Sequence, residues 1–225
     1  MNIRSYVWLI TIFLVAGCKE KEHSHTDHNK SNIYMNRNAF DDLVKGFEAP
    51  DRALWQKPEE VIAMLGDIQG KTVMDIGAGT GYFSFRMAAR GATVIAADVD
   101  ERFLEYIETK KSETGVQSVL TRKVPYDDPK LEENEADAVI IVDTYHHIEN
   151  RVAYFRNVLK GLKPDGKLMV VDFKKEETPH GPPQDHRLQP DEVIAELRKA
   201  GFTDFKSNTT ALAYQYIIIA VKKEL

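Results

Sequence analysis

Short apolar runs alternate with amphipathic stretches along the chain from about residue 70 onward. Runs rich in β-branched residues predict strands at 72–75, 93–98, 117–124, 136–143, 167–173, 202–208 and 214–221. Apolar residues spaced three and four apart predict helices at 82–90, 101–112, 151–162 and 190–200. This alternation predicts an α/β fold with a doubly wound, Rossmann-like sheet that binds ligands at the carboxyl ends of its strands.

Polar residues and glycines separate these segments. Asp100 and Asn150 each stand just before a predicted helix and are candidate N-caps. Gly201 follows the last predicted helix, and the segments 125–129 and 163–166 have the composition of turns.

A glycine-rich turn follows the first predicted strand. Asp75 ends that strand, and Gly77, Gly79 and Gly81 follow at alternate positions before the predicted helix. Glycine adopts positive φ and has no Cβ, so backbone and ligand can approach closely beside a helix N-terminus. A dinucleotide fingerprint would need glycine at position 82, which is Tyr82, and the Gly-Lys-Ser/Thr of a P-loop is absent.

The pattern Asp75-x-Gly77-x-Gly79-x-Gly81 instead resembles motif I of class I S-adenosylmethionine (SAM)-dependent methyltransferases. SAM carries an ammonium and a sulfonium but no phosphate, so a carboxylate suits its methionine end. Another mononucleotide-like ligand is the alternative. Over residues 35–222 the resemblance implies seven strands in the order 3-2-1-4-5-7-6, with strand 7 antiparallel. Segments 40–42 and 55–58 resemble the entry segment of ubiquinone/menaquinone-biosynthesis methyltransferases, and 163–168 resembles their turn into strand 5.

Asp98 ends the second predicted strand, 23 residues after Asp75. An acidic residue at this spacing can hold two ribose hydroxyls. The alternative is that Asp98 caps the next helix, although Asp100 is better placed for that role. The resemblance places Val99 and Val124 beside the cofactor. Residues 122–125 lack the family's acidic-Ala pair near the adenine, so the Val124 backbone or Tyr126 is expected to serve there.

The acceptor side is expected where the fourth strand ends. The resemblance implies that Asp143 and Thr144 border the SAM methionine, and that Tyr145, His146 and His147 orient or deprotonate an acceptor. Alternatively, one histidine packs and the other caps a helix, or positioning alone suffices because the methyl group is already activated. Two prolines do not follow Asp143, which disfavours adenine-N6 and glutamine-N5 substrates.

The loop 174–189 contains His186 and Arg187. Loops at this place in the family cover the substrate, so either side chain can meet an anionic acceptor. A plain surface loop is the alternative.

The pattern of the first 34 residues differs from that of the rest of the chain. Arg4 precedes an apolar run at 6–16, which is too short to span a bilayer and fits a signal peptide. The run ends in Val-Ala-Gly-Cys18, which resembles a bacterial lipobox with a lipid-modified cysteine. We therefore predict a signal peptide at 1–17, a polar tether at 18–34 and a methyltransferase domain at 35–225. This predicts a lipid-anchored protein of the bacterial cell envelope.

Composition narrows the function. The net charge of −5 disfavours a nucleic-acid substrate. Cys18 is the sole cysteine, so methylation through a catalytic cysteine is disfavoured. Three histidines of the tether, at 23, 25 and 28, can bind metal weakly, but a solvated linker is expected and no metal site is predicted. Two hypotheses remain: a SAM-dependent methyltransferase acting on a small-molecule or envelope acceptor, and an inactive SAM-fold lipoprotein that binds a ligand.

Overall fold

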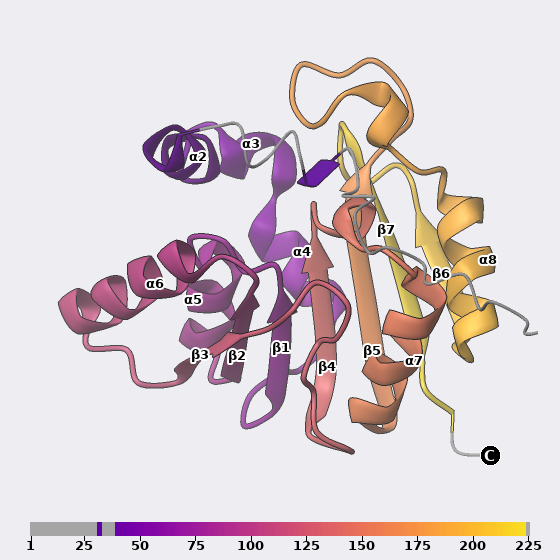
Figure 1. The fold of residues 1–225 in the computed structure, drawn as a ribbon, viewed down its shortest axis with the longest axis horizontal. Helices are drawn as coiled ribbons and strands as arrows, with labels where there is room; N and C mark the ends of the chain where they lie inside the picture. Colours follow the sequence, from indigo (N-terminus) through magenta and orange to yellow (C-terminus); the bar gives the residue numbers. More distant parts are fainter. Residues whose placement is uncertain (1–30, 33–38, 224–225) are drawn as a thin grey trace, which may run out of the picture.

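A parallel β-sheet with one antiparallel strand forms the centre of the molecule (Figure 1). The computed structural model describes residues 31–32 and 39–223 of the chain. In this part the strands are β1 (Thr72–Ile76), β2 (Thr93–Asp98), β3 (Val119–Lys123), β4 (Ala136–Val142), β5 (Leu162–Phe173), β6 (Thr203–Asn208) and β7 (Gln215–Val221). Their order is β3-β2-β1-β4-β5-β7-β6, and β7 is antiparallel to both neighbours. The predicted fold class and strand order are confirmed.

Helices cover both faces of this sheet. They are α2 (Phe40–Phe47), α3 (Arg52–Gln56), α4 (Pro58–Met64), α5 (Tyr82–Ala89), α6 (Glu101–Thr114), α7 (Arg151–Gly161) and α8 (Pro190–Ala200), with 3₁₀ turns η1 (Tyr145–His147) and η2 (Gln184–His186). Side chains of α7 and α8 pack with one set of strand residues, and those of α4, α5 and α6 pack with the alternate set. Successive strand residues point to opposite faces, so one short apolar run supplies both cores.

The strand register brings several carboxylates to one edge of the sheet. Asp75 of β1 pairs with Ala96 of β2, next to the end of β2 at Asp98. β4 and β5 run parallel to these strands and end at the same edge, just before Asp143 and just after Asp172. The helices α2 and α3 and the loop after β5 lie above this edge (Figure 1).

The structure corrects some predicted boundaries. β3 is shorter than the predicted 117–124, and β5 begins at Leu162, within the predicted helix, because Leu162 pairs with Ala136 across a bulge. Asn150 has φ +48° and its side chain makes no capping hydrogen bond, so the predicted cap is wrong. Asp100 does cap its helix, since its carboxylate accepts from the Arg102 backbone N–H at 3.0 Å.

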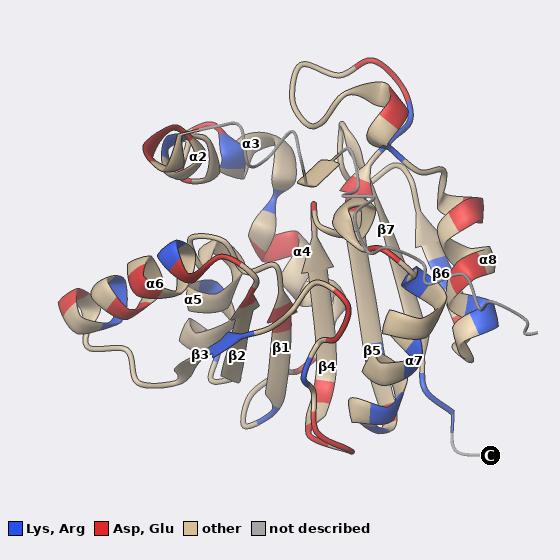
Figure 2. Cartoon of the chain, in the orientation of Figure 1, with Lys and Arg blue, Asp and Glu red and all other residues tan. Residues whose placement is uncertain are grey.

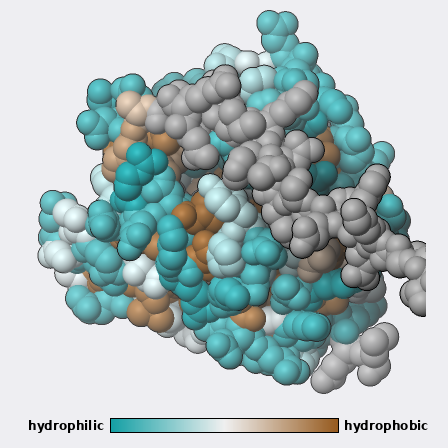
Figure 3. Space-filling view, viewed as in Figure 1, coloured by the Kyte–Doolittle hydropathy of each residue, from teal (hydrophilic) through white to brown (hydrophobic). Residues whose placement is uncertain are grey.

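The surface carries both charges and some apolar atoms. Both charges occur along α6, whereas in α8 acidic residues come first and basic residues lie in the last turn (Figure 2). A patch of hydrophobic residues shows between hydrophilic residues near the centre of the face in Figure 3.

Within residues 31–32 and 39–223, no helix combines the length and apolar character needed to cross a bilayer. Cys18 and the predicted signal peptide lie outside the described residues.

Candidate active site

The glycine turn after β1 has a backbone that requires glycine. Gly77, Gly79 and Gly81 have φ of +71°, +54° and +75°. A Cβ on Gly77 would stand 2.4 Å from the Thr144 Oγ1. The turn after β1 and the residues after β4 therefore lie too close together to admit a side chain at this position. Gly81 differs from the other two, because it does not line the cavity described below and a Cβ there would meet Phe85. Gly81 starts α5, and its predicted cofactor contact stays a prediction.

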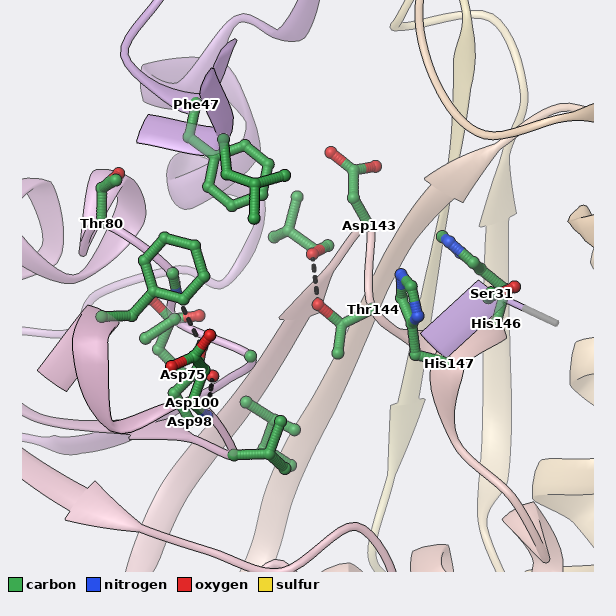
Figure 4. Close-up of a pocket in the computed structure, with 18 of the residues that line it drawn as sticks. Ser31, Phe47, Asp75, Thr80, Asp98, Asp100, Asp143, Thr144, His146 and His147 are labelled. Carbon is green, nitrogen blue, oxygen red and sulfur yellow. Dashed lines mark hydrogen bonds between the residues drawn. The ribbon is translucent and has the colours of Figure 1, made fainter. Parts of the chain in front are cut away.

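Asp98 closes this turn from the end of β2. Its Oδ2 accepts from the Gly79 N–H at 2.9 Å, and its Oδ1 accepts from the Asp100 N–H at 2.9 Å. The residue is 6% exposed, and burial raises the pKa of its carboxyl. An ionised carboxylate offers about four acceptor positions, so each oxygen of Asp98 retains capacity for a hydroxyl donor. Figure 4 shows Asp98 beside Asp75 and Asp100 on one side of the cavity.

Asp75 lies below the turn with a single short side-chain partner. Its Oδ2 accepts from the Ser84 Oγ at 2.6 Å, and Ser84 belongs to α5. Burial raises the pKa of Asp75 to about 6, and the neighbouring charge of Asp98 acts in the same direction. No ion pair joins Asp75 or Asp98 to a cation among the residues that the structure describes. This end of the site therefore suits a cationic or hydroxyl-bearing ligand.

A cavity of about 750 Å³ extends from these carboxylates across the ends of β1 and β4. Ligand pockets span roughly 300–1,000 Å³. Nearly all predicted site residues line it, namely Asp75, Gly77, Gly79, Asp98, Val99, Val124, Tyr126, Asp143, Thr144, His146, His147 and His186. In Figure 4 Asp143 and Thr144 lie between the acidic group and the two imidazoles.

Asp143 is held at the middle of the cavity by side chains from distant parts of the chain. Gln56 Nε2 donates to its Oδ2 at 2.9 Å, and Gln215 Nε2 donates to its Oδ1. Arg52 lies 4.0 Å from the same carboxylate. Burial and the nearby Asp172 raise the pKa of Asp143 to about 6, while Arg52 opposes that shift. Asp143 also has φ +53°, a left-handed conformation fixed by these contacts.

Arg52 also links α3 to the glycine turn. Its guanidinium lies 4.1 Å from the ring centroid of Tyr82, and Arg86 lies 3.7 Å from the same centroid. Arg52 further donates to the Phe47 backbone carbonyl at 2.7 Å, which ties the C-terminus of α2 to α3. Through Arg52, the helices α2 and α3 are thus joined to α5, the helix that follows the glycine turn.

His146 and Asp172 form a buried pair at the far end. The His146 Nδ1 lies 2.9 Å from the Asp172 Oδ2, and the His146 backbone N–H donates to that carboxylate at 3.3 Å. The two residues are 4% and 1% exposed. Burial disfavours a charged His146 ring, but the carboxylates of Asp172 and Asp143 outweigh it, and the pKa of His146 is raised.

His147 has a different environment although its ring centroid is only 4.4 Å from that of His146. Burial and the adjacent His146 lower the pKa of His147 to about 3, so its ring is neutral. Its Nδ1 lies 3.0 Å from the Asn32 Oδ1, and the Asn32 Nδ2 donates to the His147 backbone carbonyl at 3.2 Å. Asn32 was placed in the tether by its sequence, yet Ser31 and Asn32 are helical, buried and line the cavity.

Two predicted acceptor contacts do not match the structure. Tyr145 is fully buried, does not line the cavity, and donates its hydroxyl to Glu196 at 2.8 Å. Arg187 also lies outside the cavity lining. It is 5% exposed and donates to backbone carbonyls of its own loop, including those of Pro182 at 2.7 Å and Glu176 at 2.6 Å. Tyr145 therefore supports α8, and Arg187 holds the loop 174–189 together.

Aromatic side chains form another part of the cavity wall. The Trp55 ring stacks on His180 with centroids 4.9 Å apart and an interplanar angle of 14°. Phe173 and Tyr214 complete the group at 5.8 Å and 6.1 Å from Trp55. This wall joins α3 to the loop after β5, so a planar or apolar acceptor would find a surface of matching character.

The cavity also contains polar atoms without a protein partner. Among the described residues, these include Trp55 Nε1, Thr80 Oγ1 and Tyr82 OH, all from residues that line the cavity. Buried polar groups normally form hydrogen bonds, so these atoms are unsatisfied in the ligand-free structure. Within residues 31–32 and 39–223, no group of three histidine, cysteine or acidic residues is arranged to hold a metal.

Several site residues were missed by sequence reasoning. Asp172 lies at the end of a buried strand, as Asp75 and Asp98 do. An acidic residue at the end of an apolar run is therefore the sequence signal that could have found it. Gln215 begins an antiparallel strand at the same edge, which only the topology reveals. Gln56 and Asn32 carry no pattern in the sequence that marks them.

Comparison with known proteins agrees with this geometry. The family model described as a methyltransferase domain matches residues 74–170. This segment of the chain is therefore similar to methyltransferase domains. An uncharacterized methyltransferase of Mycobacterium tuberculosis is 30% identical over 114 residues, which cover 51% of this chain and 44% of that protein. A demethylmenaquinone methyltransferase of Tropheryma whipplei is 29% identical over 112 residues, covering 49% and 45%.

Solved structures extend the similarity beyond the matched segment. A SAM-dependent methyltransferase from Aquifex aeolicus superposes with a TM-score of 0.74 at 25% identity, covering 82% of this chain and 99% of that one. This chain aligns with less than half the length of the first curated relatives it matches. The chain thus shares the fold of a SAM-dependent methyltransferase, and its sheet edge carries the cavity described above.

Proposed function

We propose that this protein transfers a methyl group from SAM to a small-molecule acceptor. One observation carries the proposal. A single cavity joins the carboxylates of Asp75 and Asp98, with neutral donors as their partners, to the imidazoles of His146 and His147. SAM, when bound, supplies a methyl group that its sulfonium has already activated, so the protein mainly has to position the two reactants.

The cofactor end is assigned to the turn after β1 and the end of β2. Asp98 would accept from the ribose hydroxyls, because its two oxygens keep acceptor capacity after binding the N–H groups of Gly79 and Asp100. Asp75 would attract the cationic methionine portion, with Ser84 holding its carboxylate in place. Val99, Val124 and Tyr126 line the cavity where the adenine is expected.

The acceptor end lies between the histidine pair and the aromatic wall. His146 and His147 would contact the acceptor, with Asp172 holding the His146 ring. Asp143 and Thr144 lie at the boundary of the two ends. The proton lost by an O–H or N–H acceptor on methylation would pass to an imidazole or to solvent. The demethylmenaquinone methyltransferase among the relatives makes a planar acceptor of the quinone-biosynthesis type a specific candidate.

The location is proposed from the sequence. A lipid on Cys18 would anchor the chain in the bacterial envelope after removal of residues 1–17, and the acceptor would be a small molecule or a component of that envelope. Metabolic labelling with a radioactive fatty acid tests the anchor. Label incorporated by the native chain and lost in Cys18→Ser would support it, whereas equal labelling of both would contradict it.

Calorimetric titration of the full-length chain with SAM, S-adenosylhomocysteine and NADH tests the cofactor. We expect micromolar binding of the first two and none of NADH. Asp98→Ala should weaken SAM binding by at least tenfold, about 1.4 kcal/mol. Asp204→Ala is the control, because that carboxylate is exposed and pairs with Lys223 at 2.8 Å.

The outcomes separate the two functional hypotheses. Failure of the folded native chain to bind SAM would refute the proposal. Binding followed by no methyl transfer to any member of a diverse acceptor set, including reduced quinones, would favour a ligand-binding lipoprotein. Methyl transfer that is lost together with SAM binding in Asp98→Ala would support the enzyme.

A further inference from the structure

We propose that Asn32, which precedes the segment matched to the methyltransferase domain, is a positioning residue of the acceptor site. It holds the His147 ring with Nδ1 protonated, so that Nε2 is the nitrogen that accepts a hydrogen bond from the acceptor's O–H or N–H group. The inference deepens the proposed function and depends on it for the identity of that acceptor.

The contact is bidentate and joins two residues that are far apart in the sequence. The Asn32 side chain touches both the backbone and the ring of His147, 115 residues away, through contacts of 3.2 Å and 3.0 Å. Asn32 is 7% exposed, and both residues line the cavity. A buried asparagine is costly unless it is paired, and here both its amide nitrogen and its oxygen contact one residue.

The pairing determines the tautomer. The His147 backbone carbonyl can only accept, so the Asn32 NH₂ group must face it. The Asn32 oxygen then faces the His147 Nδ1, and an oxygen can only accept. The Nδ1 therefore carries the proton. In a neutral ring, Nε2 is then the unprotonated nitrogen.

The neighbouring His146 ring is held in a comparable way by Asp172. Asp172 accepts from the His146 Nδ1–H, just as Asn32 accepts from the His147 Nδ1–H. One ring faces a carboxylate and the other a neutral amide, so the two adjacent histidines have different partners although their centroids are 4.4 Å apart. Burial and the adjacent His146 lower the pKa of His147, while the amide sets which nitrogen of the neutral ring carries the proton.

Nitrogen NMR on the full-length chain labelled with ¹⁵N-histidine tests this directly. A long-range ¹H–¹⁵N correlation distinguishes a protonated from an unprotonated ring nitrogen, and His147→Gln assigns the signals. We expect the native His147 to show a protonated Nδ1 and an unprotonated Nε2. Asn32→Ala should lose this pattern in favour of a mixture containing Nε2–H, whereas Asn32→Asp should keep Nδ1 protonated, because a carboxylate still accepts from Nδ1–H.

Controls separate positioning from general stability. Asn32→Leu matches the shape of asparagine without its polar atoms and serves if the alanine variant folds poorly. Asn208→Ala removes a local cap, in which the Asn208 Oδ1 accepts from the Thr210 N–H at 3.0 Å, and should leave the His147 signals unchanged. SAM affinity should change less than twofold in every Asn32 variant, while acceptor turnover falls about tenfold to a hundredfold in Asn32→Ala.

A native His147 that carries its proton on Nε2 would overturn the inference. So would an unchanged pattern in both Asn32→Ala and Asn32→Leu. The tautomer experiment needs neither cofactor nor acceptor, so a native chain that fails to bind SAM but shows the expected shift would refute the proposed function and leave the positioning role intact.

Discussion

Replacing Gly77 by alanine tests whether the close approach of β1 and β4 shapes the cofactor site. Gly77 has φ +71°, and an added Cβ would stand 2.4 Å from the Thr144 Oγ1 and 2.5 Å from its Cγ2. Thr144 cannot turn away freely, because its hydroxyl donates to the Val142 carbonyl at 2.9 Å. The substitution therefore combines backbone strain with overlap.

The two costs can be estimated separately. A non-glycine residue in the left-handed region costs roughly 1–2 kcal/mol. Inserting a methyl group into a packed site costs typically about 1–3 kcal/mol. We expect Gly77→Ala to lower the free energy of unfolding by about 2–5 kcal/mol.

Gly115→Ala is a matched control for the backbone term. Gly115 has φ +72°, nearly the same as Gly77, but a Cβ there would find no atom within 4 Å. It ends α6 at a distance from the cavity, so only the strain of roughly 1–2 kcal/mol applies. The difference between the two variants isolates the overlap with Thr144.

Urea unfolding followed by circular dichroism measures both variants, and SAM titration measures the site. We expect Gly77→Ala to weaken SAM binding and Gly115→Ala to leave it unchanged. Adding Thr144→Ala to Gly77→Ala should recover part of the lost stability, because it removes the atoms that the new Cβ meets. If Gly77→Ala costs no more than Gly115→Ala, and Thr144→Ala restores nothing, the close-approach argument is wrong.

Three further predictions concern residues around the cavity. Burial raises the pKa of Asp75 from 3.8 to about 6, so the folded state keeps a proton that the unfolded state releases, and this group lowers stability as pH rises through that window. Relative to the native protein, Asp75→Asn should therefore raise the free energy of unfolding of the ligand-free chain more at pH 8 than at pH 4, by up to about 3 kcal/mol in urea unfolding. The substitution should also weaken SAM binding. Equal effects on stability at both pH values would contradict this. Tyr145→Phe should cost about 1 kcal/mol through the lost bond to Glu196 and leave SAM affinity unchanged; a tenfold loss of affinity would return Tyr145 to the site. Arg187→Ala should make the loop 174–189 about tenfold more sensitive to limited proteolysis, with little change in global unfolding; an unaltered digestion pattern would show that its backbone contacts do not order the loop.

The sequence predicts most of the cofactor end, because local rules place it. Asp75, Gly77, Gly79 and Asp98 sit where a strand ends or a turn begins, and parallel strands bring such ends together. Gly81 fits the same spacing but faces Phe85, since a spacing rule does not say which side of a turn a glycine occupies.

The acceptor end could not be predicted in this way, because its contacts are long-range. Asp143 is paired with Gln56 and Gln215, which lie 87 and 72 residues away, and His147 is paired with Asn32 at 115 residues. Polar pairs of this kind depend on the exact packing of α3, β7 and the segment at residue 32. Hydrophobic periodicity carries no information about them.

The charges along the cavity explain how one site can keep two ligands apart. Asp143 has Arg52 beside it, and Asp172 has His146, so both carboxylates already face a group that can carry positive charge. Asp75 and Asp98 are satisfied by neutral donors alone. Burying an unpaired carboxylate is unfavourable. Arg52 acts on Asp75 through its charge, but no ion pair joins Asp75 or Asp98 among the described residues, so a cationic ligand would relieve that cost most at this end. Under the proposed function, this difference predicts that SAM binds next to β1 and β2 and that the acceptor binds at the aromatic end beyond Asp143.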